Sequence, residues 1–177
     1  MASLSNLAKF PNFILALPLL LASCQSISST RPGGVTSTNS SSYTAVLPCL
    51  GLKLTVGNLG SDGRVPITLT AKNICNQSAM VYFGNQPAFD IIIYQGDSEI
   101  WNFNNGRPPT NILQVSNLMA GEEVNLVASW DLKNNNGSYV ATGSYRIKGV
   151  LTATGLQSDI DSLKRRETPW QNLLISP

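Results

Sequence analysis

The sequence predicts an all-β domain over residues 43–177, an antiparallel two-sheet sandwich with one short helix near the C-terminus. Three observations predict this fold. Short apolar runs alternate with polar residues at a period of two, which is typical of half-buried strands. Glycine, asparagine and aspartate gather between the runs and mark turns. Seven or eight short strands at this spacing favour a sandwich.

Five segments carry the strand prediction. Residues 50–56, 65–71, 124–130 and 145–151 alternate, so that each places its apolar side chains on one face. Residues 89–94 are apolar on both faces, which favours a central strand. The expected turns are Ser61-Asp62-Gly63, Gly96-Asp97, Asn104-Asn105-Gly106, Ala120-Gly121-Glu122 and Asn134-Asn135-Asn136-Gly137.

The short helix is expected after residue 157. Ser158 and Asp161 form a capping-box pattern, and Pro169 ends the helical stretch. The basic triplet at 164–166 (Lys-Arg-Arg) falls near the C-terminal end of this helix, where cations suit the helix dipole. A patch for anionic lipid or for a partner protein is the alternative interpretation of the triplet. Residues 170–175 are predicted to form the last strand.

Residues 1–23 are predicted to be a lipoprotein signal peptide. Residues 13–22 form an apolar run that is too short to cross a bilayer, which requires about 20 apolar residues. The run ends in Leu21-Ala22-Ser23-Cys24, which resembles the lipobox of bacterial lipoproteins. We therefore expect Cys24 to carry the lipid and the protein to be exported and anchored to a membrane of the bacterial cell envelope. An ordinary secretory signal with an unrelated cysteine is the alternative.

Residues 24–42 are predicted to be a lipidated, flexible tether. Serine, threonine and glycine dominate this stretch, and it holds too few apolar residues to order itself by burial. A folded N-terminal strand is the alternative. The folded domain is expected to begin at Tyr43.

Composition excludes several classes of function. Lys9 leaves with the signal peptide, so 11 basic side chains remain against 10 acidic ones, and this balance gives no electrostatic case for nucleic acid. The chain has no histidine, which removes a Ser-His-Asp or Cys-His device. Two cysteines besides Cys24 are too few for a thiolate zinc site. We therefore expect no enzyme activity, no metal and no cofactor.

Four short stretches together resemble a known family. They are Tyr94-Gln95-Gly96-Asp97-Ser98-Glu99-Ile100-Trp101, Met119-Ala120-Gly121-Glu122, Trp130-Asp131 and Gly143-Ser144-Tyr145-Arg146-Ile147. The set, in this order, is similar to the intracellular proteinase inhibitor (BsuPI) family over about residues 52–151. The resemblance implies an immunoglobulin-like sandwich and protease inhibition, and it assigns motif positions to Trp101, Gly121, Trp130, Asp131, Gly143 and Tyr145. The predicted export signal and lipid site depart from the intracellular members that give the family its name.

Binding, rather than catalysis, is therefore the expected function. Protease inhibition needs a rigid exposed loop on a stable scaffold, and proline limits the conformational freedom that a loop loses on binding. Two candidate loops contain proline: Gly84-Asn85-Gln86-Pro87-Ala88 and Asn104-Asn105-Gly106-Arg107-Pro108-Pro109. Either is also compatible with an ordinary connection between strands. The alternative function is a structural or assembly lipoprotein of the envelope that binds another envelope protein.

The last expectation is a disulfide between Cys49 and Cys75. Export places both thiols where disulfides form and persist, and with Cys24 acylated they have no other partner in the chain. A hairpin folded about Asp62 brings them opposite each other. Its inward-facing residues require pairs such as Val56 with Leu69, so a β-bulge is expected at residues 50–51 to bring the cysteines into register. Two separate buried thiols are the alternative.

Overall fold

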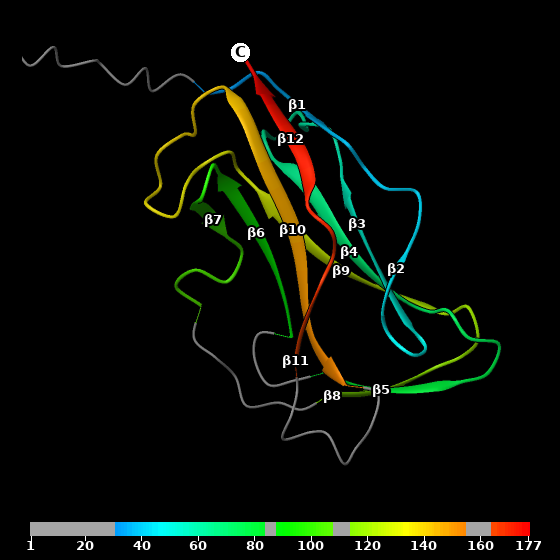
Figure 1. Ribbon diagram of the computed structural model, residues 1–177. Helices are drawn as coiled ribbons and strands as arrows, with labels where there is room; N and C mark the ends of the chain where they lie inside the picture. Colours follow the sequence, from blue (N-terminus) through cyan, green and yellow to red (C-terminus); the bar gives the residue numbers. More distant parts are fainter. Residues whose placement is uncertain (1–30, 84–87, 108–113, 155–163) are drawn as a thin grey trace, which may run out of the picture.

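Two antiparallel β-sheets lie face to face around one apolar core in the computed structural model (Figure 1). The structure describes residues 31–83, 88–107, 114–154 and 164–177. Every regular element in these residues is a strand. The predicted all-β, antiparallel two-sheet sandwich is therefore confirmed.

The smaller sheet contains the predicted Asp62 hairpin. Its strands lie in the order β2-β3-β4-β9 and are β2 (Thr44–Leu47), β3 (Leu50–Val56), β4 (Val65–Asn73) and β9 (Glu123–Trp130). Gly63 has a φ of 76° in the turn between β3 and β4, a conformation that glycine adopts without steric cost. Leu54 pairs with Leu69 and Val56 with Ile67, so the pairs share a face as expected. The predicted partner of Val56 was Leu69, which is wrong by two residues.

The larger sheet is built around one long strand. Its eight members are β1 (Gly34–Ser37), β5 (Ala79–Phe83), β6 (Phe89–Gln95), β7 (Ser98–Asn102), β8 (Gln114–Leu118), β10 (Gly143–Thr154), β11 (Lys164–Glu167) and β12 (Gln171–Ser176). The strands β12 and β11 pair with one edge of β10, whereas β6 and β5 pair with the other edge. Strand β6 lies between β10 and β7, which confirms its predicted central position.

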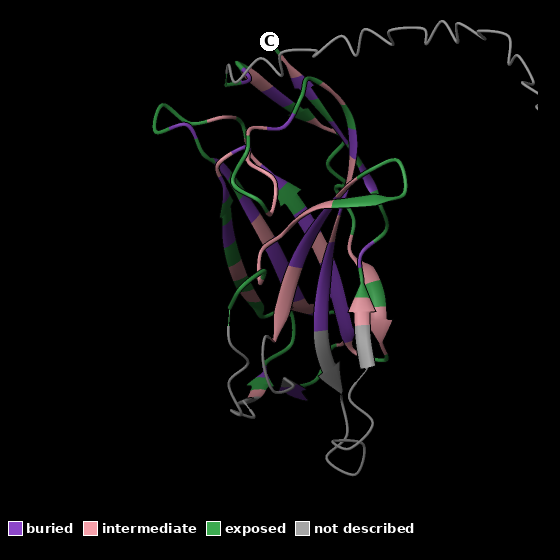
Figure 2. Ribbon diagram, turned by 90° about the vertical axis from the view of Figure 1, so that its left-hand side faces the viewer, coloured by how far each residue is buried: buried purple, intermediate pink, exposed green. Residues whose placement is uncertain are grey.

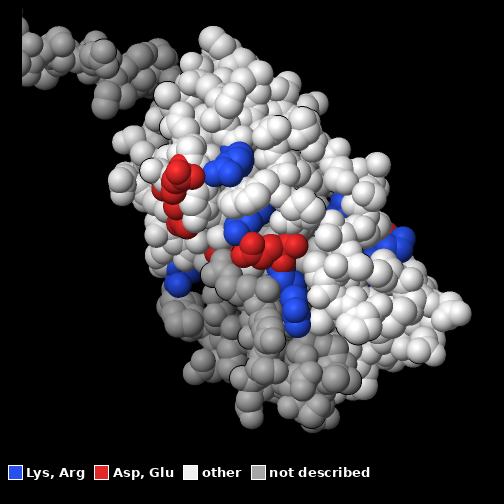
Figure 3. Space-filling model, in the orientation of Figure 1, with Lys and Arg blue, Asp and Glu red and all other residues white. Residues whose placement is uncertain are grey.

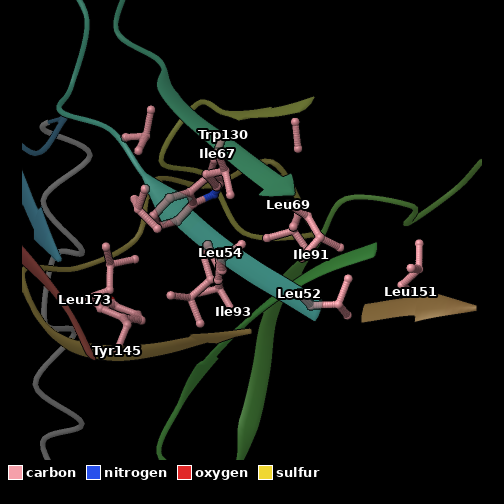
Figure 4. Close-up of a cluster of buried hydrophobic side chains, with 14 of the residues drawn as sticks. Leu52, Leu54, Ile67, Leu69, Ile91, Ile93, Trp130, Tyr145, Leu151 and Leu173 are labelled. Carbon is pink, nitrogen blue, oxygen red and sulfur yellow. The ribbon is translucent and has the colours of Figure 1, made fainter. Parts of the chain in front are cut away.

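The core fills the space between the sheets. Apolar side chains from both sheets interdigitate there, and Figure 4 shows Leu52, Leu54, Ile67, Leu69, Ile91, Ile93, Trp130, Tyr145, Leu151 and Leu173. Seen from the side in Figure 2, the buried residues run along the strands and the exposed ones gather in the turns. The sheets approach closely at Gly149, where an added Cβ would lie 2.7 Å from Leu69 Cδ1. A side chain at this position would have to displace the buried Leu69 side chain.

Two side-chain amides cover the part of β3 that β2 leaves unpaired. Asn39 Nδ2 donates to the carbonyl of Val56 at 2.9 Å, and its Oδ1 accepts the Val56 N–H at 2.8 Å. Gln171 Nε2 in β12 donates to the carbonyl of Leu54 at 2.9 Å, which joins the two sheets. These side chains therefore bond both backbone groups of Val56 and the carbonyl of Leu54 where no strand lies beside β3, while Gln171 Oε1 is buried without a partner among the described residues.

The prediction of a flexible tether over residues 24–42 is wrong for the segment that forms β1. Residues Gly34–Ser37 pair with β12, and Val35 is buried in the core, although they belong to the stretch expected to be flexible. The folded domain thus begins before Tyr43. Val35 is the one aliphatic residue between Ile27 and Tyr43, so the local sequence carries almost no strand signal, and the edge of β12 supplies the ordering instead.

The predicted C-terminal helix is wrong for residues 164–167, which form strand β11. Lys164–Glu167 pair with Val150–Ala153 of β10, so the basic triplet lies in a strand and not at a helix end. Ser158 and Asp161 lie outside the described residues. The ladder with β10 bonds alternate residues of this strand, and Lys148 Nζ lies 2.7 Å from Glu167 Oε2. Long-range pairing has overridden the local helix signals.

The disulfide between Cys49 and Cys75 is present, with its Cα atoms 5.1 Å apart. The predicted bulge is wrong, because Leu50 and Gly51 pair regularly with Asn73 and Lys72. The carbonyl of Cys49 continues this ladder by accepting the Ile74 N–H at 3.0 Å, and Cys75 follows one residue later, so the bridge joins neighbours that are offset by one residue. The buried Asn73 side chain positions this end: its Oδ1 accepts the Cys75 N–H at 2.9 Å, and its Nδ2 donates to Leu118 at 2.9 Å.

Candidate protein-binding loop

The aromatic motif residues form a structural cluster. Trp130 is fully buried, and its Nε1 donates to the carbonyl of Lys133 at 2.7 Å. The Trp101 ring lies 6.0 Å from that of Trp130 and 6.2 Å from that of Phe103, which stacks on Phe89 at 5.2 Å. These contacts join the ends of β6, β7 and β9. Trp101 and Trp130 therefore act as core residues that support the loop after β7.

Tyr145 forms a tyrosine corner. Its hydroxyl donates to the carbonyl of Ala141, four residues upstream, at 2.7 Å, and burial raises the pKa of this phenol. This hydrogen bond is a feature of many immunoglobulin-like sandwiches. Gly143 precedes it with a φ of 146°, and Gly121 has a φ of 77° in the turn before β9. Both glycines thus lie where the backbone conformation favours glycine.

Asp131 organises the connection after β9. Its Oδ1 accepts the Lys133 N–H at 3.2 Å, and its Oδ2 lies 3.8 Å from Lys133 Nζ. Between them Leu132 adopts a φ of 62°, which is unusual for a leucine, and its side chain is fully buried. Burial of this apolar side chain compensates for the strained backbone. The motif aspartate therefore has a structural role in this turn.

The loop after β7 is held by its own asparagines. Asn104 N donates to Asn102 Oδ1 at 2.8 Å, Asn105 N donates to the carbonyl of Asn102 at 3.0 Å, and Gly106 has a φ of 74°. Arg107 N then donates to the carbonyl of Asn104 at 2.9 Å. We call residues 102–107 the Asn-Arg loop. Asn102 ends β7, Phe103 N still donates to the carbonyl of Ile91 at 3.0 Å, and the local hydrogen bonds then give the rest of the loop a defined conformation beyond the ladder.

Asn135 attaches the Asn-Arg loop to the connection between β9 and β10. Its Oδ1 accepts the Asn102 N–H at 2.9 Å, and its carbonyl accepts Asn105 Nδ2 at 3.3 Å. Its own N–H donates to Ile100 at 2.9 Å. From the sequence Asn135 was assigned only to a turn. The run of three asparagines was the available signal, but it gave no indication of a partner 33 residues away.

Arg107 places an exposed positive charge at the end of the Asn-Arg loop. Its guanidinium lies 3.9 Å from the centre of the Phe103 ring, and the residue is exposed together with Asn105 and Gly106. Among the described residues it has no acidic partner, whereas Arg146 and Lys148 have Asp97 and Glu167. The stacked guanidinium can therefore bind an acidic group of another molecule. The other predicted loop residues, Gly84, Asn85, Gln86, Pro87 and Pro108, lie outside the described residues.

Away from the Asn-Arg loop, several basic side chains lie close to acidic ones. On the face drawn in Figure 3, basic and acidic side chains lie beside one another within a largely uncharged surface. Within the described ranges, no three His, Cys, Asp or Glu side chains are grouped as a metal site would require. The same ranges contain no helix long and apolar enough to cross a membrane.

The fold and the braced loop define an antiparallel β-sandwich domain with a structural aromatic cluster and an exposed, ordered turn. The family model described as intracellular proteinase inhibitor (BsuPI) matches residues 52–156, more than half of the chain. The chain therefore belongs to the BsuPI family. The match begins within β3 and includes Arg107, Trp130 and Tyr145, and so it contains the Asn-Arg loop and its supports.

Comparison with other proteins adds two distant structures. A crystal structure of a protein from Archaeoglobus fulgidus is 11% identical, with 77% of this chain and 98% of that chain covered, at a TM-score of 0.40. The CARDB domain of a Pyrococcus furiosus protein, in complex with di-metal ions, is 14% identical, with 75% and 96% covered, at a TM-score of 0.35. No curated protein matches the chain.

Proposed function

We propose that this chain is a lipid-anchored protein of the bacterial cell envelope whose sandwich binds another protein and acts as a protease inhibitor-like module. Membership of the BsuPI family is the single observation that carries the inhibitor proposal. The Asn-Arg loop supplies the contact. The lipid anchor at Cys24 is carried by the sequence Leu21-Ala22-Ser23-Cys24.

The structure of the Asn-Arg loop suits tight binding. Ordering a free side chain or loop on association costs about 0.5–1.5 kcal/mol per immobilised side chain. Here the hydrogen bonds from Asn102 and Asn135 and the stacking of Arg107 on Phe103 order the loop before any partner arrives. More of the interaction free energy is then available for affinity.

The proposed anchor places this loop away from the membrane. Gly33 N donates to the carbonyl of Ser176, so the start of the domain lies beside the end of β12 (Figure 1). Along β10, Gly143 pairs with Ile175, whereas Leu151 pairs with Phe89, whose carbonyl accepts Asn104 Nδ2. Eight residues of strand separate these positions by about 26 Å. A lipid at Cys24 therefore leaves the Asn-Arg loop well down the sandwich from the anchored end, although β5, β8 and β11 lie further still (Figure 1).

The test is inhibition by the purified protein. We expect it to slow at least one extracytoplasmic serine protease at micromolar concentration without being consumed. Arg107→Ala is expected to weaken inhibition by about 30-fold, equivalent to the loss of about 2 kcal/mol at a binding hot spot. Arg64→Ala is the matched control, because Arg64 is also exposed but lies in the turn between β3 and β4.

Two results would contradict the proposal. Absence of inhibition across a broad panel of proteases would favour an assembly lipoprotein that binds an envelope protein without inhibiting it. Equal effects of the Arg107 and Arg64 substitutions would show that the Asn-Arg loop is not the contact. A pull-down from envelope extract with the same pair of variants identifies the bound protein in either case.

A further inference from the structure

Strand β9 has one edge that no other strand of the described residues pairs with. It is the last strand of the smaller sheet, and Asn73 N donates to the carbonyl of Glu122 at 2.9 Å. With this register the even-numbered residues of β9 bond to β4, so the N–H and C=O groups of the odd-numbered residues point the other way. These residues are Glu123, Asn125, Val127 and Ser129. Within the described part of the chain no group is hydrogen-bonded to this side of the strand.

The other edge strands, β1, β2, β7, β8 and β11, are all shorter than β9, and β2, β7 and β11 each carry a further feature that discourages pairing. Strands β1 and β2 have four residues each, and β2 has a register shift and is followed by Pro48. Strand β7 is shifted against β6, and β11 has the sequence Lys-Arg-Arg-Glu. Short length, irregular register, proline and charge are the usual protections of an edge strand. Strand β9 has eight residues in unbroken register, contains no proline and carries one charge, Glu123.

The side chains of β9 are also incompletely covered. Leu69 and Ala71 of β4 are fully buried, whereas their partners Leu126 and Val124 are only half-buried although they face the core. On the opposite face Val127 is 61% exposed. A further strand beside β9 would remove this apolar surface from water.

We propose that this edge pairs with the β9 edge of a second copy of the chain. The strand is complementary to itself in an antiparallel arrangement with the two-fold axis at Leu126. In this register Asn125 lies opposite Val127 of the other copy, and each odd-numbered residue donates its N–H and accepts at its C=O. Leu126 meets Leu126 and Val124 meets Ala128 on the core side, and Glu123 meets Ser129, so no like charges are opposed.

Such a contact is weak in dilute solution and strong on a membrane. One strand pair buries less than the roughly 1,200 Å² of a stable interface. Two copies held in the same membrane by their lipids have a high effective concentration, which raises the dimer population without any new contact. The lipid anchor belongs to the proposed function, so the test includes an arm without a membrane.

The experiment is disulfide cross-linking between full-length copies. Cells co-express two differently tagged copies, one with Asn125→Cys and one with Val127→Cys, and their membranes are treated with a mild oxidant. Opposite residues of a hydrogen-bonded pair have Cα atoms about 5.5 Å apart, within disulfide range. Two copies that both carry Asn125→Cys place their thiols on a diagonal of about 7–8 Å, beyond that range, and are the matched control.

We expect the mixed pair to cross-link at least tenfold more than the Asn125→Cys pair. Adding Ser129→Pro to both copies removes an N–H that points at the partner and not at β4, so it is expected to abolish the cross-link. Ser129→Thr keeps the N–H and is expected to leave the yield unchanged. An intact Cys49–Cys75 bridge and an unchanged thermal transition verify that each variant is folded.

Three outcomes would overturn the proposal: no mixed cross-link in membranes or in purified full-length protein at about 1 mM, equal cross-linking of the control pair, or cross-linking of Asn125→Cys to a different protein. The last would assign the edge to a foreign strand. A cross-link in purified protein but not in membranes would support the dimer while contradicting the anchor.

Discussion

Removing the bridge between Cys49 and Cys75 is expected to destabilise the domain substantially. The cysteines are 26 residues apart, and in the chain-entropy model a loop of this length stabilises the folded state by about 3.5 kcal/mol. The double variant Cys49→Ser/Cys75→Ser should unfold with a midpoint lowered by about 10 °C, given about 2–4 °C per kcal/mol for a domain of this size. Thermal unfolding followed by circular dichroism measures this difference.

Reductant provides the matched control. Dithiothreitol should lower the midpoint of the unmodified protein toward that of the double variant and leave the variant itself unchanged. Intact-mass measurement after alkylation should show both cysteines protected until reductant is added. Equal midpoints with and without reductant would refute the reasoning, because the bridge would then place no constraint on the unfolded chain.

Two further predictions concern the anchor and the outer face of the smaller sheet. Cys24→Ser should abolish lipid labelling and release the protein from membranes; detergent-free fractionation in which the variant stays fully bound would contradict the lipoprotein assignment. Burial raises the pKa of Tyr43 to about 12, and the hydrogen bond to Glu123 Oε1 at 2.7 Å contributes. The pKa of Tyr43 in the folded state lies above its unfolded value of 10.0. The contribution of Tyr43 to the free energy of unfolding is therefore fully present below pH 10 and is lost as the pH rises through the folded-state pKa. Absorbance titration of tyrosinate should show a lower Tyr43 pKa in Glu123→Gln.

The connection between sequence and fold was strongest where side chains alternate. Leu52, Leu54, Ile67 and Leu69 were predicted to face one core, and all are buried there. The glycines of the expected turns, Gly63, Gly96, Gly106, Gly121 and Gly137, all have positive φ. These features depend on a residue and its immediate neighbours, which is why the sequence alone reveals them.

The candidate site was predictable only in part. The position and exposure of Arg107 followed from a turn signal beside proline. The hydrogen bonds from Asn135 that hold the loop did not, because the position of Asn135 depends on the pairing of β9 with β4 and on the contact between Trp101 and Trp130. A hydrogen bond between residues that are 33 positions apart produces no periodic pattern by which a single sequence could predict it.

The sequence by itself determined the strands at residues 50–56, 65–71, 89–94, 124–130, 145–151 and 170–175 and the hairpin about Asp62, because alternation and turn chemistry are local properties. It also favoured the pairing of Cys49 with Cys75, because only these two cysteines remain besides Cys24. Only the tertiary structure decided that β1 is a strand, that residues 164–167 extend along β10, that β3 and β4 pair without a bulge, and that one edge of β9 has no partner among the described residues. Each of these depends on which distant backbone groups remain to be satisfied once the core has formed, and that is a property of the assembled sheets and not of any segment within them.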